Sequence, residues 1–164
     1  FNGYVRIDAG KFSLSQNSNL FKLVKLFDKT ASDTQVWLAP FFVEANENQF
    51  TIPRIDALIN NDFELIAFSK LQQRLQKLEG GIGFPSKSLE KLLKLSDLPE
   101  NAMIIIPIQG SLQNPKLNIE TLVLKLAALK AADKQSPSKN PLKNILKSAP
   151  SSLPPRPNFL PWEK

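Results

Sequence analysis

The sequence predicts an α+β fold, in which a mainly antiparallel, curved and groove-like β-sheet is covered on one face or at one end by about three short amphipathic helices. Three observations lead to this prediction. Most apolar segments are rich in aromatic and β-branched residues, and several alternate with polar ones, as strands do. Short turns rich in Asn and Asp separate neighbouring segments, which favours antiparallel pairing. Leucine-rich stripes with helical spacing lie between and after the strands.

Composition removes several classes of site. The 164 residues include no histidine and no cysteine, which excludes imidazole bases, thiolate nucleophiles, disulfides and Cys/His metal sites. No run of about 18 apolar residues is present, so the sequence predicts no membrane-spanning helix. Because the only methionine is Met103, we expect the chain to be a processed protein or a piece of a longer one.

The chain divides into a β-rich body, residues 1–132, and a Pro- and Lys-rich tail, residues 133–164. The net charge is +6, and the tail holds six cationic side chains against two carboxylates. Its cations favour either a solvated end or attraction to an anionic membrane surface or nucleic acid. Proline at the density found in the tail disfavours helices and ladders, so we expect the tail to be largely disordered. Phe159, Leu160 and Trp162 would gain from docking out of water.

Periodicity predicts the first elements of the body. Residues 5–9 and 12–14 alternate between apolar and polar side chains, with a break at Gly10, which predicts a hairpin or bulged pair with one buried face. Asn19 is expected to cap a short amphipathic helix. The apolar stripe of this helix consists of Leu20, Leu23, Val24 and Phe27.

The middle of the body predicts a meander of strands over residues 34–69. Its turns are expected at residues 46–48 and 60–62, where Asn, Asp and Glu gather. Pro40 and Pro53 cannot donate to a ladder, so we expect them at edges, bends or bulges.

The second half of the body predicts two more strands and two more helices. One strand covers residues 74–84, and a helix with the buried stripe Leu89, Leu92 and Leu93 begins after Pro85. Residues 103–108 show no alternation, so both faces of this strand should be dry. Asn118 is expected to cap a longer helix that runs to Ala132.

No catalytic residue, metal site or cofactor motif is predicted, and we expect the protein not to be an enzyme. The glycines within residues 79–88 lack the spacing of a phosphate-binding loop. No two carboxylates are brought to one site by their spacing. Nucleic acid is not expected either, because Trp37, Phe41 and Phe42 lie in a stretch that contains no Lys or Arg.

Arg54 and Asp56 form a charged pair within a predicted strand. Their spacing of two residues on a strand puts both on the same face. This predicts either a solvent-facing ion pair or a polar contact with a further strand or a partner protein.

The segment IPIQGSLQNPKLN spans residues 106–118. It is similar to a signature of hydrophobic–Gly–small–Leu–x–Asn–Pro–Lys–hydrophobic residues near the C-terminal end of AsmA-like and TamB-like envelope proteins. GYVRIDAGKFSLSQNSNLFKLVKLF, residues 3–27, resembles a block of the same superfamily. VWLAPFFVEANENQFTIPRIDALINNDFELIAF and GIGFPSKSLEKLLKL follow in the order of a C-terminal AsmA-type unit. The resemblance covers the body, from Gly3 to Ala132.

The resemblance implies an elongated β-groove with an apolar lining, in the periplasm or cell envelope of double-membrane bacteria. It also implies an inner-membrane anchor in a segment outside this sequence. Such proteins shelter or transfer phospholipid between membranes or support outer-membrane assembly, and they carry no catalytic residues. Gly110, Asn114 and Pro115 match the signature, and we expect them to form a turn. The Pro-rich basic tail lies outside the family pattern.

Phospholipid acyl chains are the ligand that the resemblance implies, and other envelope proteins or the preceding part of a longer chain are further partners. Residues of one strand parity would line the groove, although each would serve equally as ordinary core. They are Val36, Leu38, Phe42, Phe50, Ile52, Phe63, Leu65, Ile104, Ile106 and Ile108. The alternative is a protein-interaction or scaffold module of the envelope without a lipid ligand, in which the sheet edge and the tail recruit partners.

Overall fold

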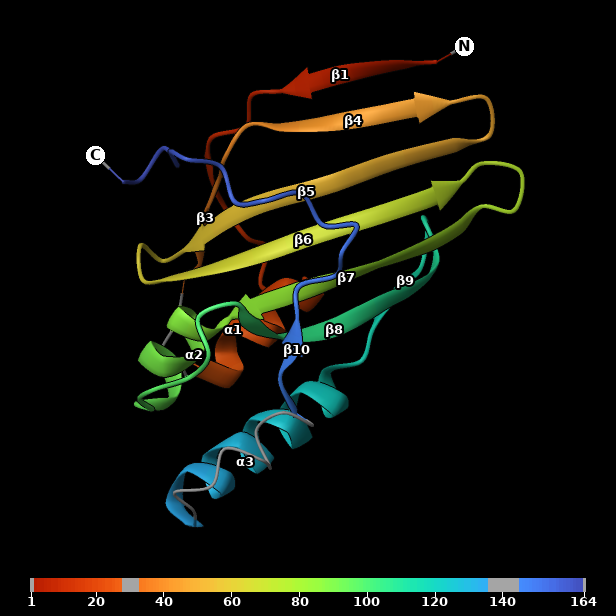
Figure 1. Cartoon of the computed structure of the whole chain (residues 1–164). Helices are drawn as coiled ribbons and strands as arrows, with labels where there is room; N and C mark the ends of the chain where they lie inside the picture. The colour runs from red at the N-terminus through yellow and green to blue at the C-terminus, as the bar shows by residue number, and fades with distance from the viewer. Residues whose placement is uncertain (1, 28–32, 136–144, 164) are drawn as a thin grey trace.

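A computed structural model describes residues 2–27, 33–135 and 145–163. In these residues ten strands form one antiparallel, open sheet, and three helices accompany it (Figure 1). The predicted α+β class is confirmed. The sheet is the dominant layer, because 44% of the residues are in strands and 20% in helices.

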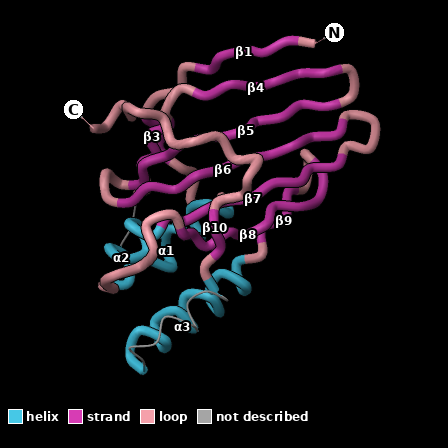
Figure 2. Tube along the Cα trace, viewed as in Figure 1, coloured by secondary structure: helices cyan, strands magenta, loops and turns pink. Residues whose placement is uncertain are grey.

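The strands build a single layer, as Figure 2 shows. Their order is β1-β4-β5-β6-β7-β8-β10; β3 pairs with both β2 and β5, and β9 folds back on β8. The four strands β5 to β8 are the longest and form the centre. The bounds are β1 (Gly3–Ile7), β2 (Lys11–Ser13), β3 (Gln35–Leu38), β4 (Phe41–Asn46), β5 (Gln49–Ile59), β6 (Phe63–Gln72), β7 (Lys77–Pro85), β8 (Ala102–Ser111), β9 (Pro115–Leu117) and β10 (Lys147–Ser148).

The three predicted helices are present as α1 (Asn19–Phe27), α2 (Ser86–Leu93) and α3 (Ile119–Gln135). Asn118 caps α3 as predicted, because its Oδ1 accepts a hydrogen bond from the backbone N–H of Thr121 at 3.0 Å. This helix continues past the predicted end at Ala132.

The cap of α1 differs from the prediction. Ser18, not Asn19, supplies it, since Ser18 Oγ accepts a hydrogen bond from the backbone N–H of Phe21 at 3.0 Å. Asn19 is already the first residue of the helix. Neighbouring polar residues both suit a cap, so composition does not choose between them.

A bulge in β5 accommodates Pro53, as predicted. The pairing of β5 with β6 shifts between Ile52, which lies opposite Ser69, and Ile55, which lies opposite Ala67. Between these two pairs β5 advances by three residues while β6 advances by two, so β5 contains one extra residue that has no partner in β6. Because proline has no backbone N–H, Pro53 is tolerated at this bulge, where the ladder is already interrupted.

The predicted turn at Gly110, Asn114 and Pro115 is confirmed as the connection between β8 and β9. Gly110 pairs with Pro115, and the backbone N–H of Asn114 donates to Ser111 O at 3.1 Å. Gly110 has φ of 118°, and a Cβ there would come within 2.6 Å of Asn114 O. Only glycine fits such a position without strain.

Alternation along paired strands gives the sheet two distinct faces. The first, which we call the helix face, carries Ile59, Phe63, Phe84 and Ile104, which form one core cluster with Leu89 of α2. Residues of α1 and α3 complete this cluster, namely Leu23, Val24, Leu122, Leu126 and Leu129. The opposite face carries Trp37, Asp56, Glu64 and Met103. We call it the strap face.

Residues 145–163, the C-terminal strap, cross the strap face from β8 towards β3 (Figures 1 and 2). The sequence predicted a largely disordered tail, and the structure places these residues of it on the sheet. Leu146 and Leu160 are buried, and β10 within the strap pairs with β8. Residues 136–144 lie outside the described residues. The proline content indicates only that the strap is poorly suited to form strands or helices by itself. It gives no information about the packing of the strap on the sheet.

Candidate functional site

Among the described residues, helices cover the helix face at one end of the sheet only. The helices gather beside β8 and the β5–β6 turn, whereas the hairpin turns β4–β5 and β6–β7 lie at the far end (Figure 1). Towards β1 and the far end, apolar side chains continue on this face without a described helix over them. We call this surface the open apolar band; it consists of Val5, Ile7, Phe41, Val43, Phe50, Ile52, Ile55, Leu71 and Leu78.

Exposure distinguishes the open apolar band from the core. Val5 is 63% exposed, Ile7 39% and Phe50 37%, and the other members are partly buried. By contrast, Phe84 and Ile104, on the same face beneath the helices, are completely buried. The band therefore leaves apolar surface in contact with water, which costs free energy unless a ligand or partner covers it.

The two faces differ in charge along the same strands. The band positions of β1, β4, β5, β6 and β7 carry no charged side chain, whereas alternate positions on the strap face include Arg6, Glu44, Lys70 and Lys77. A strand with one face in the core and one in water shows this alternation. Here the apolar side has the composition of a core but lacks a described cover.

Nine of the ten residues predicted to line a groove lie on the helix face and fall into three groups. Val36, Phe63, Leu65, Ile104 and Ile106 are ordinary core, each at most 4% exposed beneath the helices. Leu38 and Ile108 are partly buried against that core. Phe50 and Ile52 belong to the open apolar band. Strand parity was the signal for these residues, and it says nothing about how far along the sheet the helices reach.

Phe42, the tenth, lies on the opposite face. It pairs with Arg6 and makes an edge-to-face contact with Tyr4, with ring centroids 6.0 Å apart. The break at Ala39 and Pro40 between β3 and β4 changes the phase, so Phe41 takes the place on the helix face that parity had assigned to Phe42. Counting alternate residues across such a break gives the wrong side.

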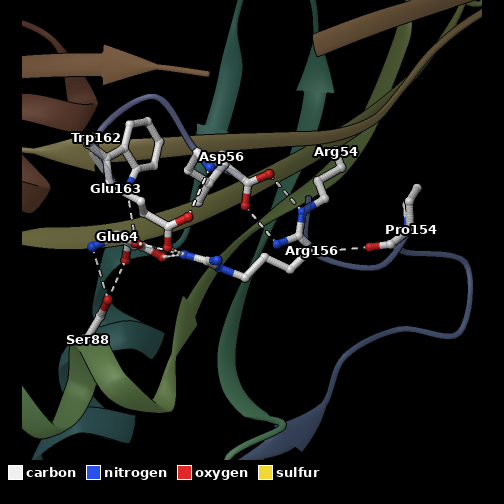
Figure 3. Close-up of polar contacts among 9 residues, drawn as sticks. Arg54, Asp56, Glu64, Ser88, Pro154, Arg156, Trp162 and Glu163 are labelled. Atoms are coloured by element: carbon white, nitrogen blue, oxygen red, sulfur yellow. Dashed lines mark hydrogen bonds and ion pairs between the residues drawn. The ribbon is translucent and has the colours of Figure 1, made fainter. Parts of the chain in front are cut away.

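On the strap face, Arg54 and Asp56 form a nearly buried ion pair beneath the strap (Figure 3). Arg54 Nε donates to Asp56 Oδ2 at 2.8 Å, and its second amino group donates to Oδ1 at 2.7 Å. Arg54 also donates to Pro154 O at 2.9 Å. Of the two predicted arrangements, the solvent-facing pair is wrong. The side chains are only 10% and 7% exposed, because the strap lies over them. Pro154 of the strap also provides the polar contact.

A second polar group, centred on Arg156, holds the end of the strap (Figure 3). Arg156 donates to Glu163 Oε1 at 2.6 Å and to Glu64 Oε1 of β6 at 3.1 Å. The indole N–H of Trp162 donates to the same Glu64 oxygen at 3.0 Å. The Trp162 ring also meets Trp37 of β3 edge to face, with centroids 5.8 Å apart. The strap is thus held by directional contacts to three strands.

Hydrogen bonding within this group lowers the pKa of Glu163. The largest cause is the bond from Arg156, followed by the bond from the backbone N–H of Leu160, and the pKa falls below its ordinary value of 4.5. Glu163 in turn raises the pKa of Arg156, and Glu64 adds to this. Both residues therefore remain charged at neutral pH, as the ion pair requires.

A cleft of about 850 Å³ lies between the strap and the sheet. Four cationic and four acidic side chains line it, among them Arg156 and Glu163. Equal numbers of opposite charges give no preference for an anionic or a cationic ligand. Within the described ranges, no three acidic side chains meet so as to hold a metal ion.

Known proteins give no further guide to the site. Comparisons with protein-family models, curated proteins and solved structures found no match. The resemblance to AsmA-like and TamB-like proteins therefore stays a prediction from short motifs. Among the described residues, no helix is both long and apolar enough to span a membrane.

Proposed function

We propose that this chain is a non-catalytic module that shelters phospholipid acyl chains on the open apolar band. It would act within an AsmA-like protein of the periplasm or cell envelope, anchored in the inner membrane by another segment. There it would help phospholipid pass between membranes or support outer-membrane assembly. The observation that carries the proposal is an uncharged apolar surface, spread over five neighbouring strands, with Val5 63% exposed.

The expected affinity suits passage better than storage. Complete burial of a methylene group contributes about 0.8 kcal/mol, and an acyl chain on an open sheet loses water on one side only. About ten methylene groups would then contribute on the order of 4 kcal/mol, which corresponds to a dissociation constant of about 1 mM. A lipid held this weakly exchanges readily, and a continuous row of strands would offer it successive equivalent positions.

Two phenylalanines provide a matched test of the ligand surface. Phe50 lies on the open apolar band at 37% exposure, and Phe42 lies on the strap face at 46%. We expect Phe50→Asn to reduce the phospholipid that co-purifies with the protein several-fold, because it places a polar side chain within the band. Solvent extraction followed by mass spectrometry measures the retained lipid. Phe42→Asn is expected to leave it unchanged; equal loss in both variants, or protein free of lipid, would contradict the proposal.

A second candidate, a scaffold module of the envelope without a lipid ligand, is favoured by the edge of the sheet. β1 is the last strand in the order and pairs, among the described residues, only with β4. Its outer side offers backbone groups for an added strand of a partner. Protein that retains no phospholipid, and whose Phe50→Asn variant behaves as the parent, would favour the scaffold.

A further inference from the structure

Two exposed hairpin turns lie side by side at the end of the sheet away from the helices. The β6–β7 turn and the β8–β9 turn are neighbours, because Lys77 at the start of β7 pairs with Ser111 at the end of β8. Each turn carries an exposed leucine at its tip. Leu75 is 71% exposed and Leu112 is 64% exposed. We call residues 70–79 and 109–117 together the hairpin end.

The two hairpins that carry these leucines also carry several cationic side chains. The hairpin end contains Lys70, Arg74, Lys77 and Lys116 and one carboxylate, Glu79. All four cations are on exposed residues, and Glu79 pairs with Lys77. The pair lowers the pKa of Glu79, chiefly through the hydrogen bond from Lys77. The hairpin end therefore keeps a positive excess at neutral pH, on turns that also project apolar side chains.

The open apolar band runs to this same end. In the paired register, Phe50 lies opposite Leu71, Leu71 opposite Leu78, and Leu78 opposite Gly110 of the β8–β9 turn. The backbone N–H of Gln73 also donates to Asn48 O at 2.9 Å, which ties the β4–β5 turn to the β6–β7 turn. A surface in contact with the hairpin end would therefore meet the end of the band.

We propose that the hairpin end docks on a bilayer that contains anionic phospholipid, with Leu75 and Leu112 inserted at the level of the headgroups. Exposed leucines can insert into the bilayer interface while neighbouring cations are attracted to the headgroup phosphates. A neutral or acidic protein surface would not favour this combination of leucines and cations. The long stems of Lys and Arg allow their charges to stay at the phosphates while the leucines enter the interface. Docking in this orientation would place the end of the open apolar band against the lipid.

The strap offers fewer exposed apolar contacts for a membrane than its sequence suggests. Leu160 is completely buried, and Trp162 is partly buried against Glu64 and Trp37. Phe159, at 60% exposure, is its remaining large exposed apolar side chain among the described residues. The strap therefore supplies a rival attachment point that one substitution can remove.

The purpose of this docking rests on the proposed function, but the docking itself is measured separately. The 164-residue chain is sedimented with vesicles of phosphatidylcholine, either pure or with about one third phosphatidylglycerol. We expect the protein to bind the mixed vesicles at least about tenfold more strongly than the neutral ones. The paired change Leu75→Ser with Leu112→Ser is expected to weaken binding to the mixed vesicles about tenfold or more.

Matched variants identify the surface. Leu124→Ser on α3 removes a leucine that is also 71% exposed, and it is expected to leave binding unchanged. Arg74→Gln with Lys116→Gln is expected to weaken binding to mixed vesicles, whereas Lys22→Gln with Lys130→Gln on the helices, of equal charge change, is not. Circular dichroism establishes that each variant is folded.

Several outcomes would overturn the proposal: equal binding to both vesicle types, no binding to either, or loss of binding on Phe159→Ser but not on the leucine pair. The lipid-retention test of Phe50→Asn is independent of these outcomes. Retained lipid without vesicle binding would reject the docking alone. Vesicle binding without retained lipid would reject the acyl-chain ligand and leave the docking in place.

Discussion

At the scale of single residues, two glycines show how differently the same residue type is constrained. Gly110 has φ of 118°, and its missing Cβ leaves room for Asn114 O. A Cβ added at Gly10 would meet nothing within 4 Å, and Gly10 has no positive φ. The sequence identified both as breaks between strands. Only the backbone conformation shows that the β8–β9 turn requires glycine at position 110, whereas position 10 has no such requirement.

The substitution Gly110→Ala is expected to destabilise the fold by about 1–3 kcal/mol, because it forces alanine into a region of φ that L-residues rarely adopt and crowds Asn114 O. Urea unfolding followed by circular dichroism measures the free energy of unfolding. Gly10→Ala is the control and should change it by less than about 0.5 kcal/mol. Similar losses in the two variants would show that the strain at the β8–β9 turn is unimportant.

At the scale of elements, the strap is attached mainly by a few side-chain contacts rather than by a ladder. β10 contributes two paired residues. The Trp162 side chain of the strap reaches β3 and β6, and Arg54 of β5 donates to the backbone carbonyl of Pro154 in the strap. The Arg156 side chain is 44% exposed, so solvent screens its ion pairs with Glu64 and Glu163 and weakens both of them. The indole and the buried Leu160 complete the attachment. Such an element can detach while the sheet remains folded.

Acid is expected to loosen the strap. The pKa of Glu163 is held below 4.5 in the folded protein, so its carboxylate favours the attached strap above that pH, and this contribution is lost as the pH falls through the lower, folded-state value. Fluorescence of Trp162 in a Trp37→Phe background, followed from about pH 6 to about pH 3, reports the change. In Glu163→Gln the part of the transition due to this carboxyl should disappear. If the parent and the Glu163→Gln variant gave the same fluorescence titration, the acid-induced change would not be due to the Glu163 carboxyl group.

At the scale of the whole molecule, the sequence predicted what local patterns control. The antiparallel order, the three helices, the bulge at Pro53 and the turn at Gly110 all follow from periodicity or backbone chemistry. Two features were not predicted because they depend on contacts between residues far apart in the chain: the attachment of the strap and the extent of the helices over the sheet. Arg54 reaches Pro154, one hundred residues away, so no local pattern reveals the attached strap. The reach of the helices over the sheet likewise decided which apolar residues are core and which belong to the open apolar band.

The bulge in β5 means that this strand carries one residue more than its ladder uses. Ile52 and Ile55 share a face because Pro53 and Arg54 together lie opposite the single residue Phe68. Deleting Pro53 should therefore leave the inside-outside phase of Phe50 and Ile52 intact and yield a straighter, folded strand. Deleting Ala57, where pairing is regular, should invert the residues on one side of the gap and prevent folding. Circular dichroism and thermal melting of the two deletions would distinguish a spare position from an indispensable one.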